Sequence, residues 1–224
     1  MKKNILFFFI LALVATSCQK EVSEEVPTNN PGGPVTADGY QPLTAGTSWK
    51  YRQTGMPDYS IIVTSNKKTV GGIQYVELSG DQVGAVTGSS WFGISGNNYY
   101  LKSAGTVPSG GSFDLTQLYL NDKEAVGHNW NISGGQANNI SAKVPGKIIE
   151  KDITLTVQGK TYNNVIHTQT NIIYVMPAPF GEMSTLFYDY YVAKGVGIVK
   201  LITSIDEDMT TVISTMELLE YSIK

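Results

Sequence analysis

Alternation of apolar and polar residues dominates the chain from Tyr40 onward. Gly, Asn, Asp and Ser interrupt this pattern, and apolar residues at helical spacing are scarce. Successive side chains of a strand point to opposite faces, so alternating runs predict β-strands. The runs cover residues 58–65, 72–79, 97–103, 141–149, 153–157, 160–174, 183–194, 197–206 and 209–223.

Short connections join these runs, with no helical pattern between them. This arrangement predicts an all-β fold, an antiparallel meander that forms a half-barrel, a barrel or a sandwich. Gly159-Lys160 predicts a tight hairpin turn with glycine first, and Asp206-Glu207-Asp208 predicts the turn of the final hairpin. Residues 113–124 fit either one helical turn or a strand.

The start of the chain has a different pattern. Lys2 and Lys3 precede an apolar run over residues 5–14, which is shorter than the roughly 20 apolar residues of a membrane-spanning helix. Small residues follow, and then Cys18, the only cysteine. A charged start, a short apolar run and small residues are typical of a secretory signal. We therefore expect residues 1–17 to be a signal peptide.

Val14-Ala15-Thr16-Ser17-Cys18 resembles the lipobox of bacterial lipoproteins, with Ala15 where Leu is usual. The resemblance implies that lipid on Cys18 holds the protein on a membrane, since each buried methylene contributes about 0.8 kcal/mol. The alternative is a cleaved signal peptide with an incidental cysteine. Gln19-Lys20-Glu21 is similar to the export signal of Bacteroidetes surface lipoproteins, which implies surface exposure on the outer membrane.

Residues 18–39 are predicted to be a flexible tether, because they are rich in Pro, Gly, Asn and Glu and have little to bury. Residues 40–224 then remain. This length suffices for one sizeable core, so we expect a single β domain.

The charge balance excludes one class of partner. The chain has 16 Lys and Arg against 19 Asp and Glu, a formal net charge of −3, and shows no basic stripe. Nucleic-acid binding requires concentrated positive charge, so we expect no nucleic-acid partner. If lipid occupies the one cysteine, internal disulfides and thiolate zinc sites are excluded as well.

No motif predicts catalysis. His128 and His167 are the only histidines, without an acidic pair at metal-ligand spacing, and His167 is interpreted as a satisfied or exposed strand residue. Residues 93–96 (GISG) lack the spacing of a nucleophile elbow and are interpreted as a loop. The sequence gives no reason to pair any two carboxylates across a cleft. We expect no enzyme activity, catalytic residue, metal or cofactor.

Aromatic residues are the remaining candidates for a site. Trp91, Tyr99, Tyr100 and Tyr119 lie in a region rich in Gly, Ser and Asn. Flat rings with a polar edge suit sugar rings and protein partners, so these four are the predicted ligand-binding residues, exposed on loops. The alternative is that they fill half-buried strand positions.

Three spaced motifs carry a second resemblance. They are Tyr40-x-Pro42-Leu43-x-x-Gly46-x-x-Trp49-x-Tyr51, Gly127-x-x-Trp130 and Tyr191-x-x-Lys194-Gly195-Val196-Gly197-Ile198-Val199-Lys200. Trp49 and Trp130 are predicted to be core anchors. The set is similar to a broad group of uncharacterised secreted and lipoprotein β domains of Bacteroidetes and related bacteria. Some of these look like the open half-barrels of periplasmic lipoprotein carriers, which implies a fold and no activity.

Three functions follow as hypotheses. The first is a non-catalytic binding module for a glycan or a protein partner at the cell surface. The second is a periplasm-facing carrier of a lipid or another hydrophobic ligand, which predicts a large apolar concavity. The third is a structural component of the envelope.

Overall fold

The computed structural model describes residues 39–80, 90–106, 112–137 and 139–224. The predicted signal peptide, Cys18 and the tether before Gly39 lie outside these ranges. The described residues form twelve strands and no helix, which confirms the all-β prediction. The strands are β1 (Ser48–Gln53), β2 (Tyr59–Val70), β3 (Ile73–Gly80), β4 (Ser90–Ser95), β5 (Asn98–Thr106), β6 (Ser112–Asn121), β7 (Asn129–Ala137), β8 (Ile140–Val157), β9 (Lys160–Met176), β10 (Gly181–Ala193), β11 (Gly197–Ser204) and β12 (Val212–Ser222).

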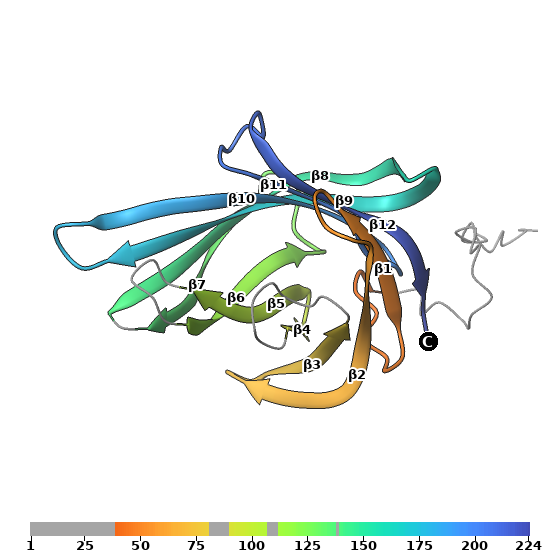
Figure 1. The fold of residues 1–224 in the computed structure, drawn as a ribbon, viewed down its shortest axis with the longest axis horizontal. Coiled ribbons are helices and arrows are strands. Elements are labelled where there is room, and N and C mark those ends of the chain that lie inside the picture. Colours follow the sequence, from red (N-terminus) through yellow and green to blue (C-terminus); the bar gives the residue numbers. More distant parts are fainter. Residues whose placement is uncertain (1–38, 81–89, 107–111, 138) are drawn as a thin grey trace, which may run out of the picture.

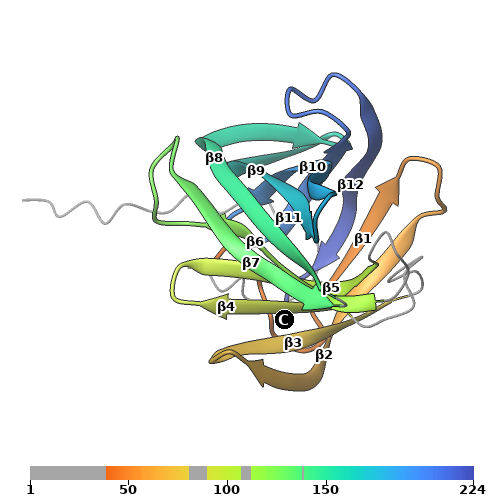
Figure 2. The same cartoon turned by 90° about the vertical axis from the view of Figure 1, so that its left-hand side faces the viewer.

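All twelve strands belong to one antiparallel sheet, in the order β6-β5-β4-β3-β2-β1-β12-β11-β10-β9-β8-β7. Neighbours in the sheet are also neighbours in sequence, except that β1 pairs with β12, with Trp49 opposite Tyr221. The predicted meander is therefore confirmed, in its barrel form. Figures 1 and 2 show the sheet curling until its two end strands, β6 and β7, meet.

Side chains close the seam where β6 and β7 meet. Trp130 of β7 donates its Nε1 hydrogen to the carbonyl of Leu118 in β6, at 3.0 Å. Thr168 of β9 donates its hydroxyl hydrogen to the carbonyl of Tyr119, at 2.6 Å. Backbone carbonyls at a sheet edge need partners, and these side chains supply them in place of a backbone ladder.

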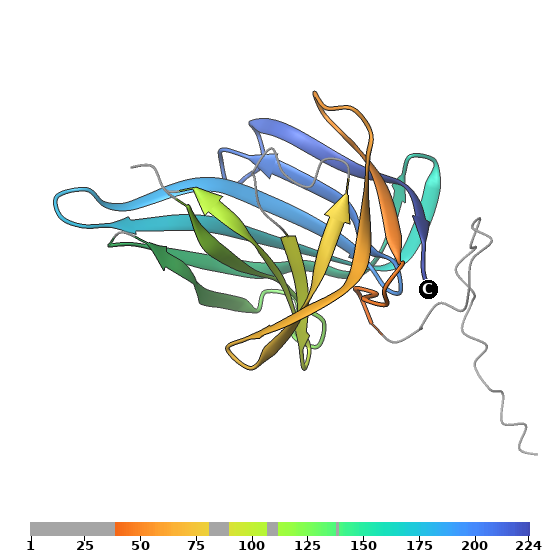
Figure 3. The same cartoon turned by 60° about the horizontal axis from the view of Figure 1, so that its bottom comes forward.

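The barrel is flattened, so its two walls face each other across an aromatic core. β8–β12 form one wall and β2–β6 the other (Figures 1 and 3). Rings make a continuous chain across the interior: centroids lie 6.4 Å apart for Trp49 and Phe92, 5.8 Å for Phe92 and Tyr119, and 5.4 Å for Tyr119 and Tyr190. Trp49 is 2% exposed and donates to the carbonyl of Val196 at 2.6 Å, which confirms it as a core anchor.

Three strands differ from the sequence-based expectation. β1, β4 and β7 were not among the predicted runs, and residues 93–96, interpreted as a loop, include the end of β4. Glycine and serine interrupt the alternation in β4, but Gly93 is needed there. A Cβ at Gly93 would lie 2.7 Å from the ring of Tyr75 in β3, so glycine gives that ring its space on the sheet.

Two further details differ in the long strands. The runs at 141–149 and 153–157 are one strand, β8, because bulges near Glu150 and Ile153 absorb the break in alternation. Residues 113–124 are mostly strand, within β6. The turn between β8 and β9 is tight as predicted, but its central residues are Gln158 and Gly159, with φ of 49° and 76°, so glycine is second.

The seam generates a testable prediction. A Cβ at Gly146 in β8 would lie 2.5 Å from Cζ2 of Trp130, the residue that bonds β6. Gly146→Ala should therefore displace Trp130 and lower the free energy of unfolding by about 1–3 kcal/mol. Urea denaturation followed by tryptophan fluorescence measures this. Gly39→Ala is the control, because its Cβ would meet its nearest neighbour, the Tyr99 hydroxyl, at 3.8 Å. Equal stability of both variants would contradict this role of Trp130.

Candidate functional site

An apolar pocket of about 300 Å³ lies inside the barrel, between the two walls. Its lining comes from β1–β5 and β10–β12 and from the connection between β1 and β2. Rings, aliphatic chains and two methionines dominate it. The lining residues are Trp49, Tyr51, Gln53, Met56, Tyr59, Ile61, Leu78, Ser90, Phe92, Leu101, Tyr190, Ile198, Leu201 and Met216.

The polar atoms of the pocket's aromatic residues are already bonded to the protein. Tyr51 donates its hydroxyl hydrogen to the carbonyl of Ile198 at 2.9 Å, and Tyr190 donates to Oε1 of Gln117 at 2.9 Å. Tyr59 lies 3.2 Å from Oε1 of Gln53 and 2.9 Å from the sulfur of Met216. Because these hydroxyl groups are satisfied within the fold, the rings present mainly carbon to the pocket.

Gln53 and Ser90 give the pocket a small polar region. Gln53 ends β1, and its Nε2 donates to Oγ of Ser214 at 3.1 Å. Both lining residues are partly exposed, unlike the rings behind them. A pocket with an apolar body and a few polar groups suits an apolar or amphipathic ligand.

Burial keeps the pocket tyrosines uncharged. Desolvation raises the pKa of Tyr59 to about 12, and it raises the pKa values of Tyr51 and Tyr190 well above their ordinary value. Taking a phenolate out of water is costly, which is why desolvation is the largest cause in each case. The interior therefore holds neutral phenols that can act only as weak acids.

Two of the four predicted ligand-binding aromatics are in the core instead of on loops. Tyr99 in β5 is 4% exposed and Tyr119 in β6 is 0% exposed. The Tyr99 hydroxyl accepts from the backbone N–H of Tyr40 at 3.2 Å and donates to Oδ2 of Asp122 at 3.2 Å. The expectation that these two are exposed is wrong, because both point between the walls of the barrel, where rings fill the space.

Trp91 and Tyr100 are the two that reach the surface. They lie on strands β4 and β5 and are partly exposed. Gly93 is opposite Tyr100 and two residues from Trp91, so both rings are on the outer face, around Tyr75. Nζ of Lys68 lies 4.1 Å from the centroid of the Trp91 ring, a cation–π contact. Whether any of the four binds a ligand stays a prediction.

Polar side chains surround the buried ring of His167 on the outer face of β8–β10. Nδ1 of His167 lies 3.1 Å from Oε2 of Glu150, and Nε2 lies 3.0 Å from Oδ2 of Asp189 without the geometry of a hydrogen bond. The ring stacks on Tyr191, with centroids 4.2 Å apart. A doubly protonated imidazole can face both carboxylates favourably, whereas a neutral one can donate to only one.

Sequence reasoning gave an apolar concavity only as what the carrier hypothesis predicts, without its residues, and it missed this pairing of carboxylates. Glu150 and Asp189 belong to different strands, and only the register places each beside His167. The pairing of His167 with Tyr191 across β9 and β10 would have been visible only with the strand order known. His167 is a buried strand residue whose Nδ1 is paired with Glu150, whereas its Nε2 has no hydrogen-bond partner, so the interpretation as a satisfied strand residue holds for one nitrogen only.

The described residues hold neither a cluster of metal ligands nor a membrane-spanning helix. Within the ranges that the structure covers, no three His, Cys, Asp or Glu side chains gather as metal ligands. Nor do these ranges contain a helix long and apolar enough to span a membrane.

Comparisons with known proteins support the fold. No family model matches the sequence, and no curated protein matches it. A candidate lipoprotein from Parabacteroides distasonis is 13% identical with a TM-score of 0.50, over 82% of this chain and 98% of that one. A candidate exported protein from Bacteroides fragilis, described as having a YmcC-like fold, is 10% identical with a TM-score of 0.43, over 81% of this chain and 97% of that one.

The likeness to the Parabacteroides protein shows a shared fold. The source organism of that protein belongs to the Bacteroidetes. The motif pattern itself stays a prediction.

The raised tyrosine pKa values predict alkaline destabilisation. Unfolded tyrosines lose their proton near pH 10, whereas folded Tyr59 keeps it up to about pH 12. In this interval the unfolded state binds fewer protons, so the free energy of unfolding should fall as pH rises and should not depend on these groups below about pH 9. The urea midpoint as a function of pH measures this. In Tyr59→Phe the urea midpoint should fall less steeply with pH than in wild type. An equal slope in both proteins would contradict the assignment of this destabilisation to Tyr59.

Proposed function

We propose that this chain is a non-catalytic, lipid-anchored protein of the cell envelope that binds one apolar or amphipathic ligand inside its barrel. The observation that carries the proposal is the interior pocket of about 300 Å³ whose ring hydroxyls are already paired. Such a surface gains free energy by covering carbon and offers little to a polar ligand. The proposal develops the carrier hypothesis.

The pocket's size limits the ligand to one chain or one small ring system. Its volume is at the lower end of the roughly 300–1,000 Å³ that ligand sites usually have. Met56 and Met216 belong to its lining and can adapt to different shapes, because methionine is flexible and polarisable. The ligand class is therefore a single acyl chain or a compound of similar bulk.

The residues around the pocket support a binding role without catalysis. Among the described residues of the lining there is no histidine, lysine or carboxylate, so Ser90 has no base beside it there. His167 faces the outside of the sheet. The envelope location rests on the signal-like start of the chain and on Cys18, with the membrane as partner through lipid.

Filling the pocket tests the proposal. Leu201 lines the pocket, and Leu201→Trp would occupy its space. We expect the full lipidated chain, purified in detergent and examined by native mass spectrometry, to carry an apolar compound or to take up added dodecanoic acid. Leu201→Trp should reduce that occupancy at least about tenfold, equivalent to about 1.4 kcal/mol.

Ile62→Trp is the matched control, because Ile62 is 43% exposed on the outer face of β2. It adds the same ring without entering the pocket. Wild-type protein that neither carries nor takes up an apolar mass would contradict the proposal. Equal occupancy in the Leu201→Trp variant would contradict it too.

A second candidate function is a surface contact with a glycan or protein partner through Trp91 and Tyr100. The observation that favours it is their shared outer face, where Lys68 adds a positive charge beside the Trp91 ring. Tryptophan and tyrosine supply large contact areas at low entropic cost. This candidate is the binding-module hypothesis restricted to Trp91 and Tyr100, because Tyr99 and Tyr119 are buried.

Crosslinking in intact cells tests this second function. A benzophenone amino acid at exposed Ser95, near Tyr100, should form an adduct with a bound partner. The double variant Trp91→Ala with Tyr100→Ala should lower the affinity about thirtyfold, and the yield with it, since each ring contributes on the order of 1 kcal/mol. Tyr119→Phe is the control. A yield unchanged by the double variant, or no adduct in wild type, would exclude this surface.

A further inference from the structure

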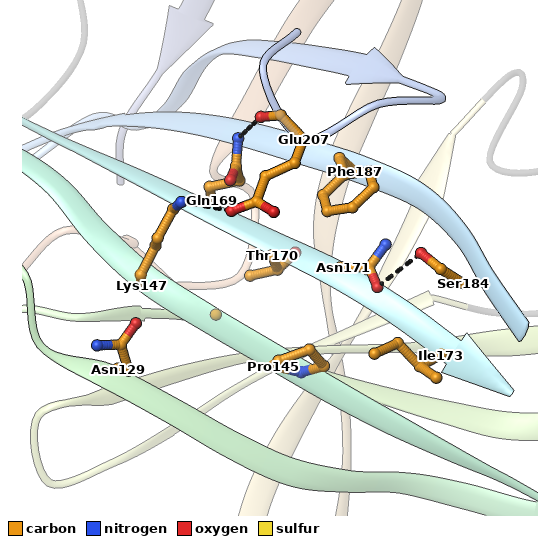
Figure 4. Close-up of a pocket in the computed structure, with 11 residues that line it drawn as sticks. Asn129, Pro145, Lys147, Gln169, Thr170, Asn171, Ile173, Ser184, Phe187 and Glu207 are labelled. Carbon is orange, nitrogen blue, oxygen red and sulfur yellow. Dashed lines mark hydrogen bonds and ion pairs between the residues drawn. The ribbon is translucent and has the colours of Figure 1, made fainter. Parts of the chain in front are cut away.

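A second cavity, of about 310 Å³, lies on the outer face of the sheet and is separate from the interior pocket. It is a groove over β8, β9 and β10, beneath the connection between β11 and β12. Figure 4 shows Glu207 reaching down from that connection and Phe187 pointing into the same space. Pro145 and Ile173 add further apolar surface to the groove, and Gln169 and Asn171 add carboxamides.

A bulge in β10 shapes one side of the groove. The register between β9 and β10 shifts between Ser184 and Phe187, and side chains satisfy the displaced backbone. Nδ2 of Asn171 donates to the carbonyl of Leu186 at 3.0 Å, and Thr185 donates to the carbonyl of Ile172 at 2.8 Å. Bulges redirect side chains and are frequent beside functional sites.

A fixed turn supplies the roof. Oδ1 of Asp206 accepts from the backbone N–H groups of Thr210 at 2.7 Å and Thr211 at 3.2 Å. Hydrogen bonding by the Thr211 hydroxyl, together with these backbone groups, holds the pKa of Asp206 well below its usual range. Oε1 of Glu207 then pairs with Nζ of Lys147 at 2.9 Å, so the roof is joined to β8 across the groove.

The surroundings fix the orientation of the Gln169 carboxamide. Its Nε2 donates to Oδ1 of Asp189 at 2.9 Å and to the carbonyl of Glu207 at 2.9 Å. Both partners accept these hydrogens, and the other oxygen of Asp189 lies 3.0 Å from Nε2 of His167. Both amide hydrogens of Gln169 are therefore in use, so its carbonyl oxygen is the group it can offer to a ligand.

The Asn171 carboxamide is fixed in the same way. Its Nδ2 donates to the carbonyl of Leu186, and its Oδ1 accepts from Ser184 at 3.2 Å. A carboxamide has two N–H hydrogens and two lone pairs on its oxygen, so Asn171 retains one donor and one acceptor. Gln169 and Asn171 are two residues apart on one strand and share its outer face. Both are more than nine-tenths buried.

We propose that this groove binds an N-acetylated amino sugar. An acetamido group has an N–H, a carbonyl and a methyl group, and it needs an acceptor, a donor and an apolar contact. Gln169 supplies the acceptor, Asn171 the donor, and Phe187 the apolar contact, while Lys147 and Glu207 at the rim can bond hydroxyl groups. A plain hexose could meet the two carboxamides only through hydroxyl groups and has no methyl group for Phe187, which costs affinity.

The test compares two disaccharides that differ in the acetamido groups. The full chain in detergent micelles is titrated with N,N′-diacetylchitobiose and with cellobiose, and saturation-transfer NMR detects contact. We expect millimolar binding of diacetylchitobiose with transfer to its acetyl methyl protons, and binding of cellobiose at least about tenfold weaker. Absence of diacetylchitobiose binding at millimolar concentrations, or equal binding of both sugars, overturns the proposal.

Variants locate the binding. Ser184→Trp should block the groove from an exposed position, and Phe187→Ala should remove its apolar wall; each should lower diacetylchitobiose affinity at least about fivefold. Ile62→Trp should bind like wild type. Leu201→Trp should also bind diacetylchitobiose like wild type, because the interior pocket is a different site. Failure of one proposal is therefore distinguishable from failure of the other. Wild-type affinity in both groove variants overturns the assignment to this groove.

Discussion

The meeting of β6 and β7 is the constraint on which the rest of this structure depends. A sheet of twelve strands ends in two edges, and exposed edges recruit other strands. Here the indole of Trp130 and the hydroxyl of Thr168 bond the carbonyls of Leu118 and Tyr119, so side chains complete what a backbone ladder would otherwise provide. That closure joins the two walls that face each other across the aromatic core.

The flattened barrel creates two different chemical surfaces from the same strands. Residues that point inward, such as Tyr190, line an apolar interior, and their neighbours in sequence, such as Asp189 and Tyr191, form a polar cluster outside. The alternation of a strand separates the two environments over the thickness of one sheet. Adjacent residues of one strand can therefore contact an apolar ligand inside the barrel and a polar ligand outside it.

Pattern alone predicted the fold class, and the interior positions were harder to assign. Long runs such as 160–174 were visible because alternation is uninterrupted there, whereas β4 was missed because Gly93 breaks the pattern to make room for Tyr75. Tyr99 and Tyr119 were expected to be exposed because polar residues surround them in sequence; which face a ring occupies is decided by bulges and strand pairing. The same limitation hid the contacts of His167, since its partners come from other strands.

The pairing of β1 with β12 has a consequence for how the protein is made. β1 lies in the middle of the strand order, yet its neighbour on one side is near the far end of the chain. A chain that is threaded through a membrane from its N-terminus cannot complete this sheet until β12 has emerged. Contacts of such long sequence separation form slowly, so the topology favours a polypeptide that stays unfolded until its last strand is available.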